Sequence, residues 1–166
     1  MFERRPPDRS HLPAAGASVY LLGIAGAGLT GLARILAAEG YGVVGSELLV
    51  TPETRRLQAH GIRFVDSDDM VTPAAVELVV HTSAAPDDHP VLQAARKANV
   101  PVLKRARAMG ALLNDRRLVA IAGTHGKTTV TAMTARVAEA GGLDPVVLVG
   151  GRVQEWDGNA RIGSGV

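Results

Sequence analysis

Two short glycine-rich segments have the residue types and the spacing that bind phosphate groups. The first reads G-I-A-G-A-G over residues 23–28, and the second reads G-T-H-G-K-T-T over residues 123–129. Each follows an apolar run typical of a strand and precedes a pattern typical of a helix. A loop in this position directs unpaired backbone N–H groups and the positive end of the helix dipole toward an anion. Both segments therefore predict phosphate binding.

The first loop is similar to the dinucleotide-binding pattern G-x-G-x-x-G, except that Ala25 stands at the middle glycine position. Its first glycine would allow the turn, and its small residues would let a diphosphate approach the backbone. Glu47 ends the next apolar run, where dinucleotide folds place an acid that binds ribose. A turn that only packs a strand against a helix, with Glu47 facing solvent, is the simpler alternative.

The second loop has the G-K-T-T core of a P-loop. Lys127 would reach the β- and γ-phosphates of ATP, and the Thr128 hydroxyl would bind Mg²⁺. The general pattern has a glycine five residues before Gly126, where this chain has Ile121, so the loop is a variant. A helix start that merely carries lysine and threonine is the alternative. A dehydrogenase would explain only the first loop, and a simple ATPase only the second.

Alternating strands and helices are predicted to position these loops. The apolar periodicity predicts strands over 18–23, 42–46, 62–65, 76–81 and 100–103, and helices over 28–39, 52–60, 89–99 and 106–113. Thr51 is the expected N-cap of the second helix, with Pro52 at its first position. Short links between such elements predict a doubly wound, Rossmann-like α/β domain with a mostly parallel sheet.

A polar stretch at residues 114–117 is a candidate domain boundary. Beyond it, a strand over 118–122, a helix over 127–140 and a strand over 146–149 are expected, as at the beginning of a P-loop ATPase-type α/β domain. Two strands and one helix cannot cover both faces of a parallel sheet. We therefore predict a disordered leader over 1–16, a complete first domain over 17–114 and an incomplete second domain over 115–166.

The composition narrows the class of protein. Hydrophobic residues make up 46% of the chain, charged residues 20% and aromatic residues 3%, which favours a globular α/β protein with an aliphatic core. The lack of cysteine excludes disulfides and thiolate metal sites and favours the cytoplasm. No apolar run reaches the roughly 20 residues of a membrane helix. The net charge of +2, without a basic stripe interleaved with aromatics, argues against nucleic-acid binding.

These motifs resemble the muramyl ligases, which use ATP to join an amino acid to a UDP-linked acid. Residues 122–129 match the family string A-G-T-H-G-K-T-T in full. Residues 23–33 are similar to G-I-G-G-A-G-M-S-G-L/I-A, the first loop of the alanine-adding branch and of a relative that recycles muropeptides. Further similarity occurs at 45–47, 81–85, 101–108, 142–145, 150–151 and 159–161. The resemblance extends from about Ser18 to Val166.

The resemblance implies a reaction in peptidoglycan precursor synthesis. The carboxylate of UDP-N-acetylmuramate would attack the γ-phosphate of ATP, bound with Mg²⁺, and L-alanine would then displace phosphate from the acyl phosphate. The UDP-sugar contacts implied are Gly23, Ala25, Gly26, Ala27, Gly28, Leu29, Thr30, Glu47, Ser83, Ala84 and Arg105. The ATP contacts implied are Gly123, Thr124, Gly126, Lys127, Thr128 and Thr129, with Lys127 and His125 catalytic and Thr128 binding the metal. A solvent-facing His125, a solvated Arg105 and a Ser83 that only caps its turn are the simpler alternatives.

The chain also departs from the family pattern. Ala25, Glu47 and Arg107 stand where the family has Gly, Asp and Glu. The acidic metal-binding cluster and the amino-acid-binding domain of the family would follow Val166. The resemblance therefore implies a part of a ligase that is inactive alone. A degenerate, non-enzymatic nucleotide-binding module and a fragment of an NAD-dependent dehydrogenase are the alternatives.

Overall fold

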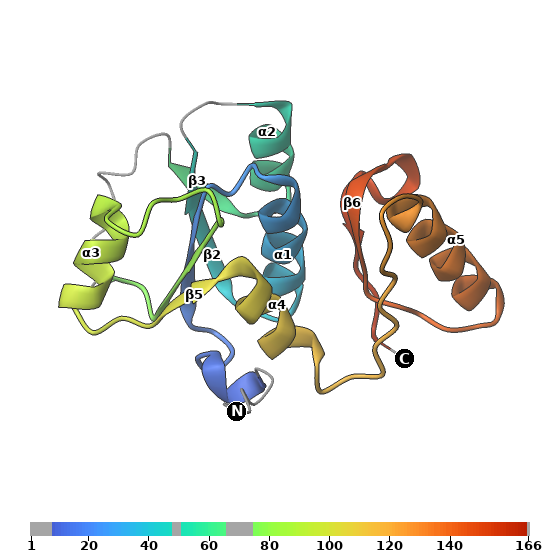
Figure 1. Cartoon of the computed structure of the whole chain (residues 1–166), viewed down its shortest axis with the longest axis horizontal. Helices are drawn as coiled ribbons and strands as arrows, with labels where there is room; N and C mark the ends of the chain where they lie inside the picture. The colour runs from blue at the N-terminus through green and yellow to red at the C-terminus, as the bar shows by residue number, and fades with distance from the viewer. Residues whose placement is uncertain (1–7, 48–50, 66–74, 166) are drawn as a thin grey trace.

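The computed structural model describes residues 8–47, 51–65 and 75–165 (Figure 1). The strands are β1 (Ser18–Leu22), β2 (Gly42–Ser46), β3 (Arg63–Val65), β4 (Leu78–His81), β5 (Val102–Lys104), β6 (Val147–Val153) and β7 (Gly158–Arg161). The helices are α1 (Ala27–Ala38), α2 (Pro52–Ala59), α3 (Pro90–Lys97), α4 (Arg105–Leu113) and α5 (Lys127–Ala140), with 3₁₀ turns η1 (Arg9–His11) and η4 (Gln154–Trp156). Among the described residues, no helix combines the length and the apolar character needed to cross a membrane.

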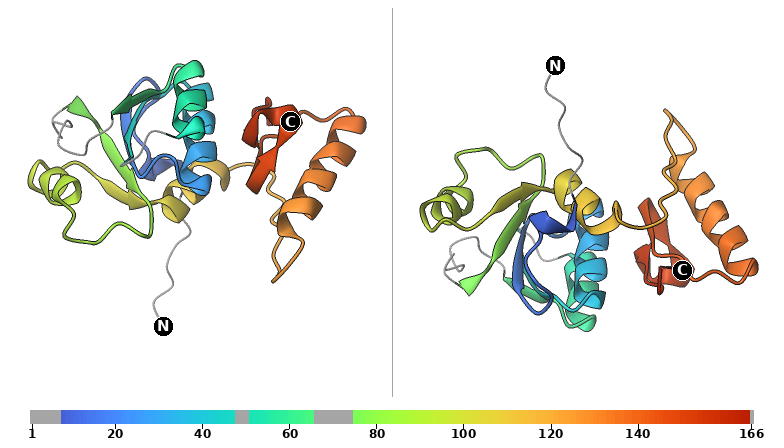
Figure 2. Two further views of the ribbon diagram at one scale, coloured as in Figure 1. Left: turned by 90° about the horizontal axis from the view of Figure 1, so that it is seen from above. Right: turned by 90° about the horizontal axis from the view of Figure 1, so that it is seen from below.

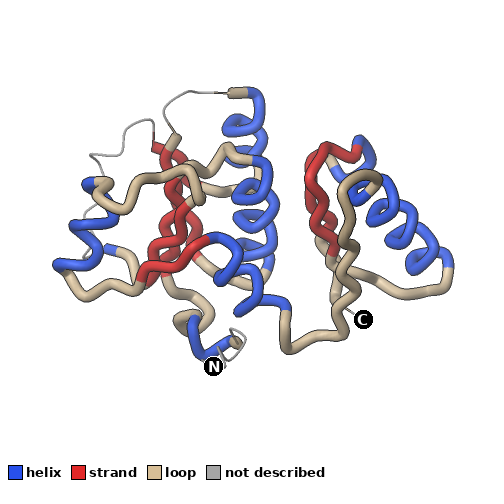
Figure 3. The backbone as a smooth tube through the Cα atoms, viewed as in Figure 1, coloured by secondary structure: helices blue, strands red, loops and turns tan. Residues whose placement is uncertain are grey.

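The first five strands form one parallel sheet in the order β3-β2-β1-β4-β5. Helices α1, α2 and α4 pack on one face of this sheet and α3 packs on the other, as Figures 1 and 3 show. The predicted doubly wound α/β fold is therefore confirmed. The strand order reverses between β1 and β4, and such a switch point opens a crevice at the carboxyl ends of the strands.

Local signals explain where the elements of this sheet begin and end. Each predicted helix and strand up to residue 113 is present, with ends that differ by at most two residues. Thr51 caps α2 as expected, because its side chain accepts a hydrogen bond from the Thr54 N–H while Pro52 begins the helix. Gly40 follows α1 with φ 88°, a left-handed conformation that glycine adopts without strain.

The central strand β1 is buried on both faces of the sheet. Val19, Tyr20 and Leu21 have no exposed surface, and they divide between an apolar cluster under α1 and another under α3. The Tyr20 hydroxyl donates a hydrogen bond to Oγ of Ser46, which ends the neighbouring strand β2, at 2.5 Å. The core thus extends directly beneath the first glycine loop and supports it.

Gly45 of β2 gives the first glycine loop room to pack, and replacing it should destabilise the fold. A Cβ at this position would lie 2.5 Å from Ile24 Cδ1 and 2.8 Å from the backbone oxygen of Leu21. Because that oxygen belongs to the paired strand, the overlap cannot be relieved by a side-chain rotation. We expect Gly45→Ala to lower the free energy of unfolding by about 1–3 kcal/mol, or the Tm by roughly 3–10 °C, in thermal unfolding.

Gly42 in the same strand is the matched control for this substitution. A Cβ there would make only ordinary van der Waals contacts, the nearest with Ser18 Oγ at 3.5 Å, and the position is exposed. Gly42→Ala should leave the Tm unchanged or raise it slightly, because alanine restricts the unfolded chain more than glycine does. Equal Tm values for the two variants would contradict the packing role of Gly45.

The second unit consists of α5 packed on an antiparallel β6–β7 hairpin (Figure 2). The predicted strand over 118–122 is wrong, because these residues pair with no strand in the part of the chain that the structure describes. Leu118 and Val119 are 56% and 70% exposed and line an apolar groove of about 590 Å³ beside α5. An apolar run forms a strand only where a partner completes its hydrogen bonds, and here β6 pairs with β7 instead.

Residues 8–16 are ordered against the first unit, which corrects the prediction of a disordered leader for this stretch. Asp8 caps the turn η1 by accepting a hydrogen bond from the Ser10 N–H. Arg9 donates to Glu39 at 2.9 Å and to Asp115 at 2.8 Å, and thereby joins the end of α1 to the segment after α4. These long-range ion pairs left no periodic signal in the sequence. Residues 1–7 lie outside the described residues, and the predicted boundary at 114–117 stays a prediction.

Candidate functional site

A cavity of about 590 Å³ lies at the switch point of the sheet, between β1 and β4. The start of α1, the turn after β4, the first half of α4 and one face of β6 surround it. Its lining residues are Gly26, Ala27, Gly28, Leu29, Thr82, Ser83, Ala84, Arg105, Met109, Leu148, Val149 and Gly150. Seven of these were predicted to contact a UDP-sugar, so the structure brings most of the first predicted site together.

The first glycine loop presents backbone donors to this cavity. Gly26 is the N-cap of α1, and its carbonyl accepts hydrogen bonds from the N–H groups of Leu29 at 2.8 Å and Thr30 at 3.0 Å. The N–H groups of Ala27 and Gly28 lie in the first turn of α1, where no preceding helical carbonyl can accept their hydrogen bonds. Both residues line the cavity. Their donors and the helix dipole are suited to an anion.

Arg105 brings a positive charge to the same donors. It is the first residue of α4, and its side chain lies against Gly28. A Cβ at Gly28 would come within 2.7 Å of Arg105 Cζ, so a larger residue here would displace the guanidinium from its present position. Arg105 Nη1 also contacts Met109 Sδ at 4.0 Å. A guanidinium beside unpaired N–H groups forms a cluster suited to a diphosphate.

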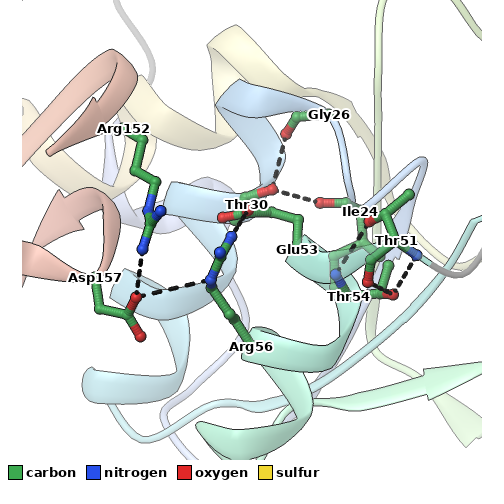
Figure 4. A network of polar contacts seen from close by, with 9 residues as sticks. All are labelled: Ile24, Gly26, Thr30, Thr51, Glu53, Thr54, Arg56, Arg152 and Asp157. Carbon is green, nitrogen blue, oxygen red and sulfur yellow. Dashed lines mark hydrogen bonds and ion pairs between the residues drawn. The ribbon is translucent and has the colours of Figure 1, made fainter. Parts of the chain in front are cut away.

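The other residues predicted for the UDP-sugar site shape the loop and do not line the cavity. Gly23 turns the chain with φ 80°, and its N–H donates to the Ser46 carbonyl at 3.0 Å. The Ala25 N–H donates to Glu47 Oε2 at 3.2 Å. Thr30 is buried, and Figure 4 shows its hydroxyl between two loop carbonyls, at 3.0 Å from Ile24 O and 3.2 Å from Gly26 O. Their predicted ligand contacts remain predictions.

Sequence reasoning missed five residues of the cavity lining. Thr82 lies in the turn after β4, where only Ser83 and Ala84 were predicted as contacts. Met109 lies one helical turn after Arg105 in α4. Leu148, Val149 and Gly150 come from β6 in the second unit. The position of Met109 one helical turn from a predicted contact could have been noticed. The contribution of β6 could not, because it depends on how the two units pack.

His81 is a buried titratable group at the edge of this site. It ends β4, directly before the turn that lines the cavity, and its Nδ1 lies 3.0 Å from the Thr82 carbonyl. Burial lowers the pKa of His81, and the hydrogen bond to Thr82 only partly offsets this effect. The imidazole is therefore neutral at pH 7 and adds no positive charge to the Arg105 cluster.

The second glycine loop leads into α5, and no strand directly precedes it in the part of the chain that the structure describes. Gly126 caps α5 with φ 77°, and Gly123 has φ 148°, both of which favour glycine. Lys127 Nζ donates to the backbone oxygens of Gly123 at 2.6 Å and Thr124 at 3.0 Å, so the ammonium group lies over the loop. All the predicted ATP contacts are exposed. These features fit the phosphates of a nucleotide.

The metal-binding role predicted for Thr128 stays a prediction. Thr128 lies in the first turn of α5, next to β6, where a Cβ at Gly150 would be 3.4 Å from its Oγ1. Its hydroxyl can offer one ligand to Mg²⁺. No group of three or more His, Cys, Asp or Glu residues suited to a metal occurs in the described part of the chain. His125 is exposed on the loop, and its catalytic role stays a prediction.

Comparison with known proteins identifies the family. A model of the Mur ligase catalytic domain matches residues 18–117. The chain belongs to the Mur ligase family. The UDP-N-acetylmuramate–L-alanine ligase of Acidiphilium cryptum is 42% identical over 154 residues, which are 93% of this chain and 32% of that protein. The chain therefore spans about a third of the length of this relative.

Solved structures of Mur ligases have the same arrangement of elements. The UDP-N-acetylmuramate–alanine ligase of Thermotoga maritima is 32% identical, with a TM-score of 0.82 over 90% of this chain and 35% of that one. A murein peptide ligase of Psychrobacter arcticus is 25% identical, with a TM-score of 0.80 over 91% of this chain and 34% of that one.

Proposed function

We propose that this Mur ligase chain is the part of a UDP-N-acetylmuramate–L-alanine ligase that binds the UDP-sugar and the phosphates of ATP. The observation that carries the proposal is the position of β6 between the two loops. Gly150 lines the cavity of the first loop and also adjoins Thr128 of the second loop. Two phosphorylated ligands bound at these loops would meet across a single strand, as a phosphoryl transfer between them requires.

Different residues of the chain would bind the UDP-sugar and ATP. The N–H groups of Ala27 and Gly28, with Arg105, would bind the diphosphate and direct the acid end of the sugar toward β6. Lys127 would neutralise charge on the terminal phosphate, and Thr128 would hold Mg²⁺. ATP with Mg²⁺ supplies the phosphoryl group that makes a carboxylate reactive toward the amine of alanine.

The alanine-adding branch is supported over the muropeptide-recycling branch by sequence identity. Among the solved structures, the alanine ligase from Thermotoga maritima is 32% identical and the murein peptide ligase from Psychrobacter arcticus 25% identical. Because these substrates and ATP are cytoplasmic metabolites, a cytoplasmic location and a role in peptidoglycan synthesis are part of the proposal.

The departures from the family pattern do not favour a degenerate module. Ala25 and Glu47 bond to one another, and neither they nor Arg107 line the cavity. Arg107 Nη2 lies 3.4 Å from His11 Nε2, on the exposed side of α4. A dehydrogenase fragment would leave the second loop without a role. The cavity lining is therefore consistent with a UDP-sugar.

Thermal unfolding with added ligands tests the proposal. A ligand at 100 times its Kd should add about 2.7 kcal/mol to the stability of the chain, or roughly 5–10 °C in Tm. We expect UDP-N-acetylmuramate and ATP–Mg²⁺ each to raise the Tm, and NAD to leave it unchanged. A shift with NAD alone would favour the dehydrogenase alternative, and no shift with any ligand would favour the degenerate module.

We further propose that the 166-residue chain binds these ligands without ligating them. No group of three or more His, Cys, Asp or Glu residues suited to a metal occurs among the described residues, and the chain spans about a third of the length of its relatives. Incubation with UDP-N-acetylmuramate, L-alanine and ATP–Mg²⁺ should release no phosphate above background. Stoichiometric, alanine-dependent phosphate release would contradict this part of the proposal.

A further inference from the structure

The β6–β7 hairpin packs directly on α1, the helix that begins with the first glycine loop. Gly31 allows the close approach, because a Cβ at this position would overlap the Leu148 side chain. On the neighbouring helix α2, Arg56 Nε lies 3.7 Å from Asp157 Oδ1 of the hairpin, as Figure 4 shows. The second unit therefore contacts the structural support of the first loop, and it also lines the cavity.

Asn159 of β7 extends this contact to the loop itself. Its side-chain Nδ2 donates to the backbone oxygen of Ala27, the first residue of α1. Asn159 is only 5% exposed, and its Oδ1 is buried without a hydrogen-bond partner among the described residues. A buried, half-satisfied amide destabilises a fold, whereas leucine has nearly the same size without this penalty. Packing alone therefore does not explain an asparagine here.

The hydrogen bond from Asn159 acts on the peptide unit that carries the N–H of Gly28, a residue that lines the cavity. The Ala27 carbonyl and the Gly28 N–H belong to the same planar peptide unit, and they point in opposite directions. Holding the carbonyl from the hairpin side therefore fixes the direction of the Gly28 N–H on the cavity side. A hydrogen bond accepted by the carbonyl also polarises the unit and strengthens its N–H as a donor.

We propose that Asn159 is a positioning residue for the first glycine loop, and that it orients the Gly28 N–H toward the diphosphate of a bound nucleotide. This inference rests on the proposed function of the cavity. It makes the diphosphate site a product of both units, because the donor belongs to the first unit and the group that orients it belongs to the second.

The test compares Asn159→Leu with Arg34→Met in the 166-residue chain, using UDP and ATP–Mg²⁺ as separate probes in titration calorimetry. Arg34 provides the control because its Nη1 donates to the Ala160 carbonyl at 2.8 Å, so it joins the same helix to the same strand away from the loop. We expect Asn159→Leu to raise the Kd for UDP about tenfold, the effect of losing one good hydrogen bond to a charged group. Its Tm and its affinity for ATP–Mg²⁺ should change little, and the Gly28 amide resonance should shift in NMR spectra of the free protein.

Arg34→Met should lower the Tm and leave the Kd for UDP within about threefold, because it removes a part-buried hydrogen bond without affecting the loop. If Asn159→Leu does not fold, Asn159→Ala tests the same donor without added bulk. Equal losses of UDP affinity in the Asn159 and Arg34 variants, or an unchanged Kd in the Asn159 variant, would overturn the positioning role. A wild-type chain that binds no UDP would instead contradict the proposed function on which this role rests.

Discussion

Replacing Lys127 with methionine is expected to weaken the binding of ATP–Mg²⁺ by at least about 100-fold, because a lysine in this loop makes more than one hydrogen bond to charged phosphate oxygens. The side chain already lies over the loop through its contacts with the Gly123 and Thr124 carbonyls. Methionine keeps the length of the side chain and loses the charge and the donors. Titration calorimetry would measure the Kd directly.

The stability of the chain and its other ligand provide the controls for this variant. Lys127 is exposed, so its replacement should change the Tm of the free protein by little. The affinity for UDP-N-acetylmuramate should also be unchanged, because Lys127 does not line the cavity of the first loop. Lys97→Met, at the exposed end of α3, should leave the binding of both ligands unchanged. Unaltered ATP–Mg²⁺ binding in the Lys127 variant would exclude the P-loop role.

Replacing Arg105 with methionine is expected to weaken the binding of UDP-N-acetylmuramate by roughly 10- to 100-fold, since hydrogen bonds to a charged group contribute about 1.5–3 kcal/mol. The guanidinium lies against Gly28, beside the loop donors that would bind the diphosphate. The affinity for ATP–Mg²⁺ should not change. Arg105→Lys should restore only part of the binding, because an ammonium group cannot make the paired contacts of a guanidinium.

Arg107, two residues further along α4, is the matched control. It is exposed, outside the cavity lining, and its Nη2 contacts His11. Arg107→Met removes the same charge from the same helix, so it corrects for any general effect of net charge on an anionic ligand. We expect its Kd for UDP-N-acetylmuramate to stay within about threefold of wild type. Similar losses in the two variants would indicate long-range attraction and contradict a direct contact by Arg105.

Much of the first unit could be predicted because its signals are local. Thr51 and Pro52 mark the start of α2, and β1 is largely apolar after Ser18 because both of its faces are buried. The glycines of the two loops report backbone conformations, such as φ 80° at Gly23 and φ 77° at Gly126, that few other residues adopt. Residue type and spacing are sufficient for such features, since each depends on neighbours in the chain.

The features that could not be predicted depend on contacts between distant parts of the chain. Residues 118–122 have the composition of a strand, but a strand also needs a partner, and the sequence does not say that β6 pairs with β7. Likewise, Arg9 was assigned to a disordered leader because nothing nearby indicates its ion pair with Glu39. The composition of a segment indicates which structures it can form, and its contacts with distant residues decide which of them it forms.

The candidate site shows the same division. The sequence by itself determined the two glycine loops, the parallel fold that supports the first one and seven residues of the cavity lining. Only the tertiary structure decided that β6 closes the cavity beside Thr128 and that Asn159 reaches Ala27 across 132 positions of the chain. The physical reason is that loop geometry follows from backbone preferences, whereas the docking of the hairpin depends on how Gly31 and its neighbours allow two separate units to approach.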